Sequence, residues 1–520
     1  MKNLLFILLI PFILDAQVKD KVAVKYAETI TKTELSQHLH EIASDNYEGR
    51  ETGMIGQKMA AAYLAGEFNS YGIQPFKGSY FQKFPLILQY AYGVDVSSSD
   101  SSFKWMRDFY YWHELDNKKV DIKEIAFIGY GISNDKYNDY TNIDVSGKGV
   151  IFYDGEPSKK GSLFLSEDGL PSEWSMDPLN KINFAIEKGA RAIFIVKKNH
   201  KEIVGNESYQ HYMEQPKMLL NKTLKDRLTV PVLYISEDMA KALTDGLLDF
   251  DKTLAKINKK GKAKSSVHTL SKTFYVDVNR QNDNLTSENV LAFIEGSDLK
   301  NEVVVITAHY DHIGKNGDEI FNGADDDGSG TVALLEIAEA FQIAKREGKG
   351  PRRSILIMPV SGEEKGLLGS EFYSDHPLLP LRNTVANLNI DMIGRMDENY
   401  KGDPNYIYLI GSDILSQDLH DISEQANKTY SNLKLDYRYN DLNDPNRFYY
   451  RSDHYNFAKH NIPCIFYFNG VHEDYHQSSD TVEKIDFEKM EKISRLIFYT
   501  AWDLVNRDER IKLNTPLVNE

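Results

Sequence analysis

Residues 302–314 read EVVVITAHYDHIG, an apolar run of β-forming residues that ends in two histidines and an aspartate. Residues 321–330 then read FNGADDDGSG and lead into a long amphipathic pattern that continues to Gly348. Apolar residues that recur every three or four positions are typical of a helix that buries one face. This stretch therefore predicts a buried strand, a polar loop and a helix, the repeating unit of an α/β fold.

The same alternation continues toward the C-terminus. Further strands are expected at 289–296, 352–364, 385–394, 405–412 and 462–470, and further helices at 413–430 and 486–506. Strands that alternate with helices favour a helix-flanked, mostly parallel mixed β-sheet, and we predict this α/β fold class for the segment 271–520. Ligands of such sheets bind at the strand ends.

A segment with a different pattern of apolar and polar residues precedes this alternation. Short apolar runs separated by turn residues occur at 124–132, 147–156, 190–197 and 230–236, with one amphipathic candidate helix at 180–190. This pattern predicts a compact β-rich module, which we place at 119–270 as an insertion between 17–118 and 271–520. After about residue 240 we expect a polar stretch, with the basic run NKKGKAK at 258–264 as a solvated linker.

The N-terminal sequence, MKNLLFILLIPFILDAQ, combines a lysine, an apolar stretch and a small residue, Ala16. This layout is typical of a secretory signal peptide, and the apolar stretch is shorter than the roughly 20 residues that a spanning helix needs. We predict a signal peptide at 1–16 and an exported protein, periplasmic or extracellular, without a membrane span after cleavage. An uncleaved membrane anchor is the alternative.

Charge and cysteine content narrow the class of protein. The chain has 520 residues, a formal net charge of −16 and one cysteine, Cys464. The acidic balance argues against a nucleic-acid partner, because proteins that bind phosphates present a basic face. Cys464 lies in an apolar run, where we expect it to be buried. An exported protein without disulfides must be stabilised by its core or by metal.

Metal-binding residue types follow four of the predicted strands. They are His309 with Asp311, the pair Glu363 and Glu364, Asp391, and His476 with Asp480. Crowded carboxylates repel one another, and a divalent cation removes the conflict. Imidazole with carboxylate suits zinc, although cobalt or manganese could occupy the same donors. One zinc uses about three protein ligands, whereas at least five donors are present, so we expect two cations that share a carboxylate and one spare glutamate as a base.

Each motif has a simpler explanation when it is taken alone. A single histidine at a strand end is usually a satisfied core or surface residue. The DDDGSG stretch could be a calcium loop, or acidic residues that favour a helix N-terminus. The GEEKG stretch could be a solvated turn. We prefer a metal site because all of these motifs fall at strand ends of one α/β segment.

Five motifs, HYDHIG, NGADDDGSG, SGEEKGLLGS, NIDMIGR and YHQSSDT, follow one another between residues 309 and 481. In this order they resemble the co-catalytic di-zinc aminopeptidase family, which also contains glutamate carboxypeptidase II. The resemblance is strong over 285–505, and residues 48–75 resemble the N-terminal helix pair of the family. It implies a fold of the zinc-exopeptidase type, in which the inserted module is similar to the protease-associated domain that many members carry.

The family pattern implies two zinc ions and assigns their ligands. His309 and Asp391 would hold one zinc, and Glu364 and His476 would hold the other. Asp326 would bridge the two ions. Its flanking aspartates would support it, and the cis peptide of the family would follow it in the chain.

The resemblance also implies roles for residues that do not bind zinc. Glu363 would be the general base, and Asp311 would orient the ring of His309. Tyr475 could donate a hydrogen bond to the oxyanion that develops during hydrolysis. His312 could face the metal or the solvent, and we favour solvent or loop packing. The segment RSDHYNF at 451–457 resembles a stretch near the family's substrate pocket.

A zinc-dependent hydrolase is implied, specifically an aminopeptidase that removes N-terminal residues from peptides. In the expected reaction Glu363 removes a proton from a metal-activated water and later gives it to the leaving amine. A carboxypeptidase or dipeptidase with the same metal chemistry is the nearest alternative, and a single-zinc glutaminyl cyclase is disfavoured because the donor set for two metals is complete. A catalytically inactive peptide-binding protein on the same fold is the alternative of a different class.

Overall fold

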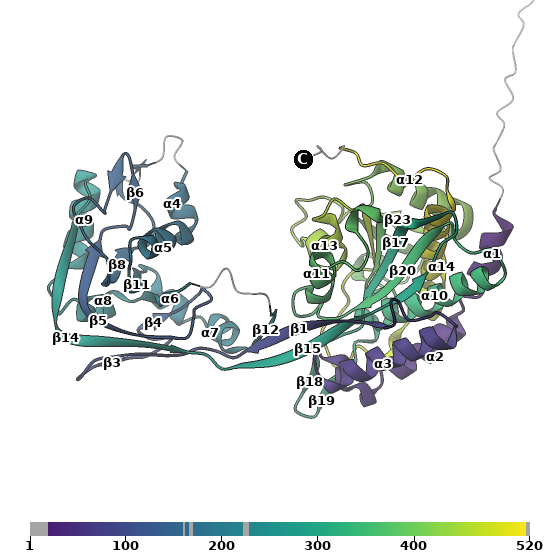
Figure 1. Ribbon diagram of the computed structural model, residues 1–520, viewed down its shortest axis with the longest axis horizontal. Helices are drawn as coiled ribbons and strands as arrows, with labels where there is room; N and C mark the ends of the chain where they lie inside the picture. The colour runs from purple at the N-terminus through teal and green to yellow at the C-terminus, as the bar shows by residue number, and fades with distance from the viewer. Residues whose placement is uncertain (1–18, 160–161, 166–169, 222–227, 516–520) are drawn as a thin grey trace, which may run out of the picture. The chain divides into compact units, whose positions relative to one another are not determined.

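The computed structural model describes residues 19–159, 162–165, 170–221 and 228–515, and the predicted signal peptide at 1–16 lies outside these residues. The chain folds into two compact units (Figure 1). Unit 1 contains the residues up to Leu86 and from Leu285 onward, and unit 2 is Ile87–Asn284. The chain passes from one unit to the other within two strands, β1 (Phe81–Gln89) and β15 (Asn282–Val290).

Unit 1 is built on a seven-stranded sheet in the order β16-β20-β17-β21-β24-β22-β23. The central strands β20, β17, β21 and β24 are parallel, whereas β16 and the pair β22–β23 run antiparallel to them. The prediction of a mostly parallel, mixed sheet is therefore confirmed. The strands are β16 (Ala292–Ile294), β17 (Leu299–His309), β20 (Arg353–Val360), β21 (Thr384–Ile390), β22 (Tyr406–Ile410), β23 (Lys434–Asp436) and β24 (Cys464–Phe468).

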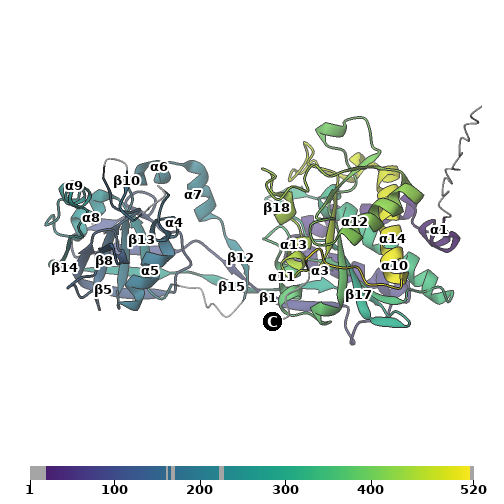
Figure 2. The ribbon, with the colours of Figure 1, turned by 90° about the horizontal axis from the view of Figure 1, so that it is seen from above.

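Helices cover both faces of this sheet (Figures 1 and 2). Alternate residues of β17 point to opposite faces, so that Val304 and Ile306 pack with α10 and α14, whereas Val303 and Val305 pack with α11 and α13. Because both faces are buried, the central strands are continuous apolar runs. The helices are α1 (Lys21–Ala27), α2 (Lys32–Ile42), α3 (Ile55–Ser70), α10 (Gly330–Arg346), α11 (Leu368–Asp375), α12 (Gln417–Ala426), α13 (His454–Ala458) and α14 (Phe487–Asn506).

Unit 2 contains an eight-stranded sheet in the order β3-β2-β14-β5-β8-β11-β13-β4. Strands β5, β8, β11 and β13 are parallel, and β14 and β4 pair antiparallel at the two sides of this group. Its strands are β2 (Gly93–Ser97), β3 (Ser102–Phe103), β4 (Phe109–Tyr110), β5 (Lys118–Ile128), β8 (Gly149–Tyr153), β11 (Ala192–Val196), β13 (Val232–Ile235) and β14 (Ser265–Asn279). Its helices are α4 (Glu173–Met176), α5 (Pro178–Glu187), α6 (His200–Val204), α7 (Glu207–Glu214), α8 (Glu237–Leu243) and α9 (Phe250–Lys260).

The stretch after residue 240 differs from the predicted polar linker. It forms α8, α9 and β14, and the basic run 258–264 is the end of α9 followed by a short connection. α9 is an amphipathic helix, because Phe250, Leu254 and Ile257 recur at helical spacing and are buried. Its many lysines made this pattern difficult to recognise in the sequence. Since β2 and β14 belong to the sheet, unit 2 extends beyond 119–270 at both ends.

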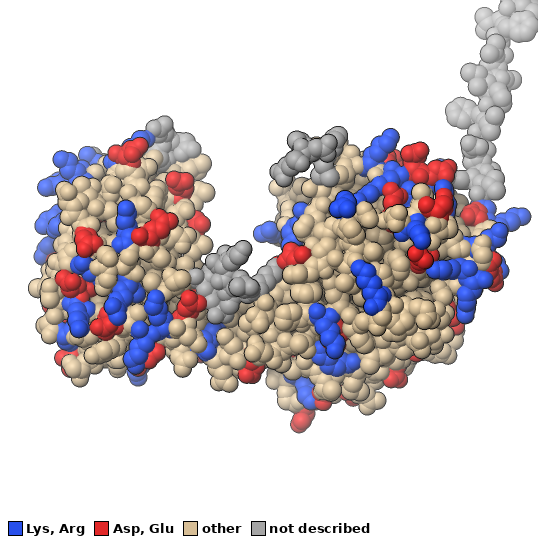
Figure 3. Space-filling model, viewed as in Figure 1, with Lys and Arg blue, Asp and Glu red and all other residues tan. Residues whose placement is uncertain are grey.

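Cys464 is buried in β24, in agreement with its apolar surroundings in the sequence. None of the helices within the described residues has the length and hydrophobicity needed to cross a bilayer. On the face drawn in Figure 3, Lys and Arg are interspersed with Asp and Glu on each unit.

Candidate metal centre

Four parallel strands of unit 1 end at one edge of the sheet, and the predicted donors lie there. His309 is the last residue of β17, and Asp391 directly follows β21. The pair Glu363 and Glu364 follows β20, and His476 lies in the loop after β24. Asp326 comes from the loop that enters α10. The parallel strand order thus brings together side chains that are far apart in the sequence, as expected for open α/β sheets.

One group of donors, which we call the His309 subsite, consists of His309, Asp326 and Asp391. The Nε2 atom of His309 lies 3.2 Å from Oδ1 of Asp326 and 3.7 Å from Oδ1 of Asp391. The ring of His309 and the carboxylate of Asp326 are almost fully buried. Asp391 is oriented by Ser452, whose Oγ donates a hydrogen bond of 2.6 Å to Oδ2. These contacts leave Oδ1 of Asp391 facing the subsite.

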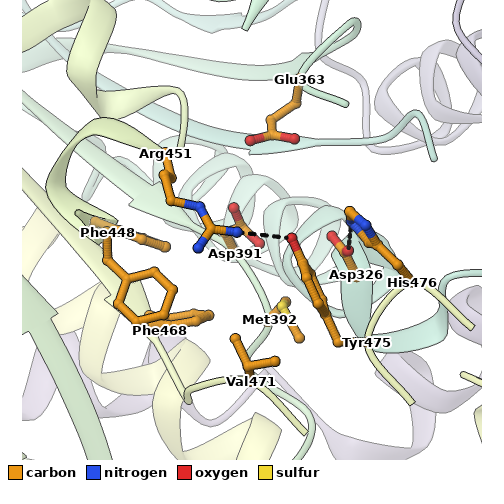
Figure 4. Close-up of a pocket in the computed structure, with 11 residues that line it drawn as sticks. Asp326, Glu363, Asp391, Met392, Phe448, Arg451, Phe468, Val471, Tyr475 and His476 are labelled. Carbon is orange, nitrogen blue, oxygen red and sulfur yellow. Dashed lines mark hydrogen bonds and ion pairs between the residues drawn. The ribbon is translucent and has the colours of Figure 1, made fainter. Parts of the chain in front are cut away.

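The second group, the His476 subsite, consists of Asp326, Glu364 and His476. The Nε2 atom of His476 lies 3.2 Å from Oδ2 of Asp326 (Figure 4). It also lies 3.2 Å from Oε2 of Glu364. The two oxygens of Asp326 therefore face two different histidines, the arrangement that a bridging carboxylate needs. The peptide bond from Asp326 to Asp327 is cis, as the family resemblance implied.

The donor atoms fit divalent cations because they are near one another yet unpaired. Within the described part of the chain, Nε2 of His309, Nε2 of His476, Oδ2 of Asp326 and Oε1 of Glu364 are buried and have no hydrogen-bond partner. Buried polar atoms without partners are rare in proteins and call for an explanation. Nitrogen and oxygen atoms that lie close together without hydrogen bonds form a suitable site for zinc, which takes His and carboxylate ligands.

The pKa shifts in the cluster also show that its carboxylates are stabilised by nearby positive charge. Burial raises the pKa of Asp326, but the imidazoles of His309 and His476 outweigh it and hold this pKa well below its usual value. Burial lowers the pKa of His476, but Asp326 and Glu364 outweigh it and raise this pKa to about 10. The imidazoles and the carboxylates of the cluster thus stabilise each other's charged forms.

Glu363 belongs to neither group of donors. Its carboxylate lines the pocket (Figure 4), and its Oε2 atom lies 3.9 Å from Nε2 of His309, which is outside that lining. Burial, with Glu364 and Asp391 acting in the same direction, raises the pKa of Glu363 well above its usual value, although His309 opposes the shift. A carboxylate with raised proton affinity beside the metal donors has the properties of a general base.

Asp311 contacts the ring of His309 through its backbone oxygen rather than through its carboxylate. The Nδ1 atom of His309 lies 3.0 Å from the backbone oxygen of Asp311, whereas the nearest carboxylate oxygen of Asp311 is 3.9 Å away. The carboxylate instead accepts hydrogen bonds from Oγ1 of Thr52, at 2.6 Å, and from the backbone N–H of Glu363, at 3.3 Å. It therefore links the loops after β17 and β20.

Asp327 lies close enough to His309 and Asp391 to be considered a donor. However, its oxygens accept backbone N–H groups of His309, Gly330 and Met392, at 3.2, 2.8 and 3.1 Å. An acid used in this way fixes the backbone and has little capacity left for a cation.

Asp325 and Asp480 also hold the backbone of the bridging loop. Asp325 accepts the backbone N–H of Gly394, and Asp480 accepts the N–H groups of Asp325 and Asp326, at 3.0 and 3.1 Å. Asp480, which follows a strand end in the sequence like the donors, therefore orients Asp326 from its backbone side.

A pocket adjoins the metal donors (Figure 4). One side chain of this pocket, Tyr475, stacks on His476 with ring centroids 3.9 Å apart, and its hydroxyl lies 3.3 Å from Nη2 of Arg451. Burial raises the pKa of Tyr475, so the phenol stays protonated and able to donate. The pocket is lined by Asp326, Glu363, Asp391, Met392, Phe448, Arg451, Phe466, Phe468, Val471, Tyr475 and His476.

The sequence did not identify Arg50 as part of the site. This residue supports the metal centre through hydrogen bonds to the backbone of the loops around it. Its buried guanidinium donates hydrogen bonds to backbone oxygens of Ile42, Tyr310, Asn322 and Gly323. It thereby connects the loop after β17 to the loop that carries Asp326. The available signal was the position of Arg50 in EGRETG, within the segment that resembles the N-terminal part of the family.

Arg50→Met is expected to lower the free energy of unfolding by about 2 kcal/mol or more, because several buried carbonyl groups lose their donor. Denaturant unfolding of the metal-free protein measures this effect. Arg107→Met, at an exposed arginine of unit 2, is the matched control. Equal stability of the two variants would contradict a supporting role for Arg50.

His312 does not face the solvent, which was one part of the preference for solvent or loop packing. The residue is fully buried, and its Nδ1 atom lies 2.8 Å from Oε1 of Glu364. The loop folds inward here because the backbone N–H of His312 donates to the backbone oxygen of Arg50 at 3.2 Å. The sequence pattern did not reveal this contact, because Arg50 is remote in the chain.

The chain is similar in sequence to known peptidases. Residues 289–501 match the family model of Peptidase family M28. The chain is 26% identical over 237 residues to "Aminopeptidase YwaD" of Bacillus subtilis, which covers 44% of this chain and 47% of that protein. It is 31% identical over 225 residues to "Leucine aminopeptidase 1" of Sclerotinia sclerotiorum, covering 42% and 55%. The chain thus spans about half the length of these curated relatives.

Among solved structures, the aminopeptidase from Aneurinibacillus sp. strain AM-1 has 18% sequence identity and a TM-score of 0.48, covering 96% of this chain and 98% of that one. All six residues described above as donors or base, from His309 to His476, lie inside the segment matched by the family model. Residues 289–501 of this chain are therefore similar to peptidase family M28 in the segment that carries the candidate donors.

Proposed function

We propose that this chain is an exported zinc-dependent aminopeptidase that uses two zinc ions. The observation that carries the proposal is the position of Asp326, whose two oxygens face His309 and His476 in separate donor groups. The M28 match and the aminopeptidase relatives support the same class of enzyme. The apolar N-terminal sequence supports export as a proposal made from the sequence alone.

Each residue of the centre has a role in this proposal. His309 and Asp391 would hold one zinc, Glu364 and His476 the other, and Asp326 both. Bound zinc would acidify a water and polarise the scissile carbonyl. Glu363 would accept the proton from the water and return it to the leaving amine. Tyr475, whose phenol remains protonated, would donate a hydrogen bond to the developing oxyanion.

The pocket supports an exopeptidase that accepts an apolar terminal residue. Met392, Phe448, Phe466, Phe468 and Val471 supply apolar surface beside the donors. An apolar side chain placed there would leave the terminal amine near the carboxylates. Unit 2 would correspond to the protease-associated domain of related enzymes, a role that rests on the sequence resemblance.

Arg451 favours a second candidate function, a carboxypeptidase or dipeptidase. Its guanidinium lies in the pocket lining beside Tyr475 (Figure 4). Guanidinium groups bind carboxylates in a bidentate manner, so Arg451 could bind the terminal carboxylate of a substrate.

Peptides with one blocked end distinguish these functions. We expect cleavage of a peptide with a free amine and an amidated carboxyl end, and no cleavage of a peptide of the same sequence with an acetylated amine and a free carboxyl end. Activity should be lost in the presence of chelator and return when zinc is added. Cleavage only of the peptide with a free carboxyl end would support the second candidate, and binding without cleavage of either peptide by the zinc-loaded protein would indicate an inactive peptide-binding protein.

A further inference from the structure

His312 lies against the His476 subsite, although the family resemblance assigns it no role. Its side chain is completely buried, with Nδ1 2.8 Å from Oε1 of Glu364 and 3.9 Å from Oδ2 of Asp326. Its ring centroid lies 5.9 Å from that of His476, with the rings inclined by 70°. His312, Asp326 and Glu364 each offer an atom to a cluster compact enough to hold one ion.

The short contact between His312 and Glu364 is not an ordinary hydrogen bond. Despite the separation of 2.8 Å, neither Nδ1 of His312 nor Oε1 of Glu364 has a hydrogen-bond partner in the described portion of the chain. Because the distance is suitable for a hydrogen bond, the angle between the two groups must be the reason that none forms. His476 shows the same combination toward Glu364, with its Nε2 close to a carboxylate oxygen but unpaired. Both imidazoles therefore place a ring nitrogen that is free of hydrogen bonds beside the carboxylate of Glu364, where a shared cation could use it.

The surrounding backbone fixes the ring of His312 in this place. Residue 312 pairs with Glu51 in an isolated parallel bridge and donates its backbone N–H to Arg50. Gly323 has a φ of +52°, and a Cβ atom at this position would lie 2.5 Å from the Cγ and Cδ2 atoms of the His312 ring. The glycine thus leaves room for the imidazole from the side of the bridging loop.

A packing role alone does not account for this residue. Burial of a polar group without hydrogen bonds costs free energy, and both ring nitrogens of His312 lack a partner among the described residues. An apolar side chain would fill the same space without that cost. A cation at the subsite would use the free nitrogen on the side of Glu364.

We propose that His312 is a further ligand of the cation held by Asp326, Glu364 and His476. The proposal rests on the two-zinc centre proposed above and makes it asymmetric. The His476 subsite would have three donors of its own, Glu364, His476 and His312, whereas the His309 subsite would have only His309 and Asp391 besides the shared Asp326. The His476 subsite would consequently bind zinc more tightly and fill first when zinc is limiting.

Metal binding by purified His312→Ala tests this inference. We expect the zinc affinity of one subsite to fall by at least about 10- to 100-fold, the range known for weaker perturbations of metal sites. Competition with a chromophoric chelator gives the affinities, and elemental analysis gives the zinc content after dialysis. His200→Ala is the matched control, because His200 of unit 2 is also buried with both ring nitrogens unpaired in the described structure.

A second variant, His312→Gln, separates ligation from hydrogen bonding. The glutamine amide can donate to Glu364, whereas glutamine is not among the usual ligands of zinc. We expect it to bind zinc as weakly as His312→Ala does. Native affinity in either variant would overturn the inference. The thermal unfolding temperature of both variants in chelator should be close to that of the wild type. This measurement separates loss of zinc from loss of fold. Absence of zinc from the wild-type protein would instead refute the proposed function.

Discussion

Glu363→Ala is expected to reduce kcat by at least about 100-fold while the zinc content stays at the wild-type level. The carboxylate lines the pocket and lies near His309, but it is not part of either donor group. Its removal therefore takes away the group that would accept the proton from water without removing a ligand. Burial and the neighbouring acids also raise its proton affinity, as suits a base in this position.

Steady-state kinetics on a peptide with a free amine, combined with elemental analysis, measures both parts of this prediction. Glu398→Ala provides a control at an exposed glutamate of the same unit. Wild-type turnover in Glu363→Ala would refute the assignment of the base. A loss of zinc in parallel with activity would instead show that Glu363 is a ligand.

Asp326→Ala is expected to lose at least one zinc ion and almost all activity. Each oxygen of Asp326 faces a histidine of a different subsite, so that its removal deprives both subsites of a donor. Zinc-induced stabilisation should decrease as well, since a ligand present at 100 times its Kd stabilises a protein by about 2.7 kcal/mol. In chelator the loss of stability should be smaller, because only the contacts of Asp326 with the imidazoles of His309 and His476 are then removed and not a zinc ligand.

Zinc content and thermal unfolding, with zinc and with chelator, test this second prediction. Asp318→Ala, at an exposed position in the turn before the same loop, is the control. Two tightly bound zinc ions in Asp326→Ala would show that Asp326 does not bridge. Equal destabilisation with and without zinc would point to a role in folding of the loop alone.

The main elements of unit 1 were predictable because their signals are local. The apolar run before His309 predicted β17, and the amphipathic pattern after Ser329 predicted α10. α14 begins at the expected place because Asp486 accepts a hydrogen bond from the N–H of Lys489 and caps its first turn. In unit 2, α9 was missed, since its lysines outweighed a buried stripe of only a few residues.

The candidate donors were predictable for a related reason. His309, Asp391 and Glu364 occur at or shortly after the ends of buried strands, where a parallel sheet gathers its ligand-binding groups. Their short motifs also resemble a family, which supplied the assignment of roles. The distances between the donors were not available from spacing along the chain, because the residues come from separate loops.

The sequence by itself determined the residue types of the candidate metal centre and the strand ends on which they lie, because apolar periodicity and motif chemistry are local properties. Only the tertiary structure decided which neighbours complete the centre. His312 is turned inward by the backbone of Arg50, and Asp311 approaches His309 through its carbonyl oxygen rather than its carboxylate. These contacts join segments remote in the sequence, and their geometry follows from how the loops pack at the sheet edge, which no local pattern specifies.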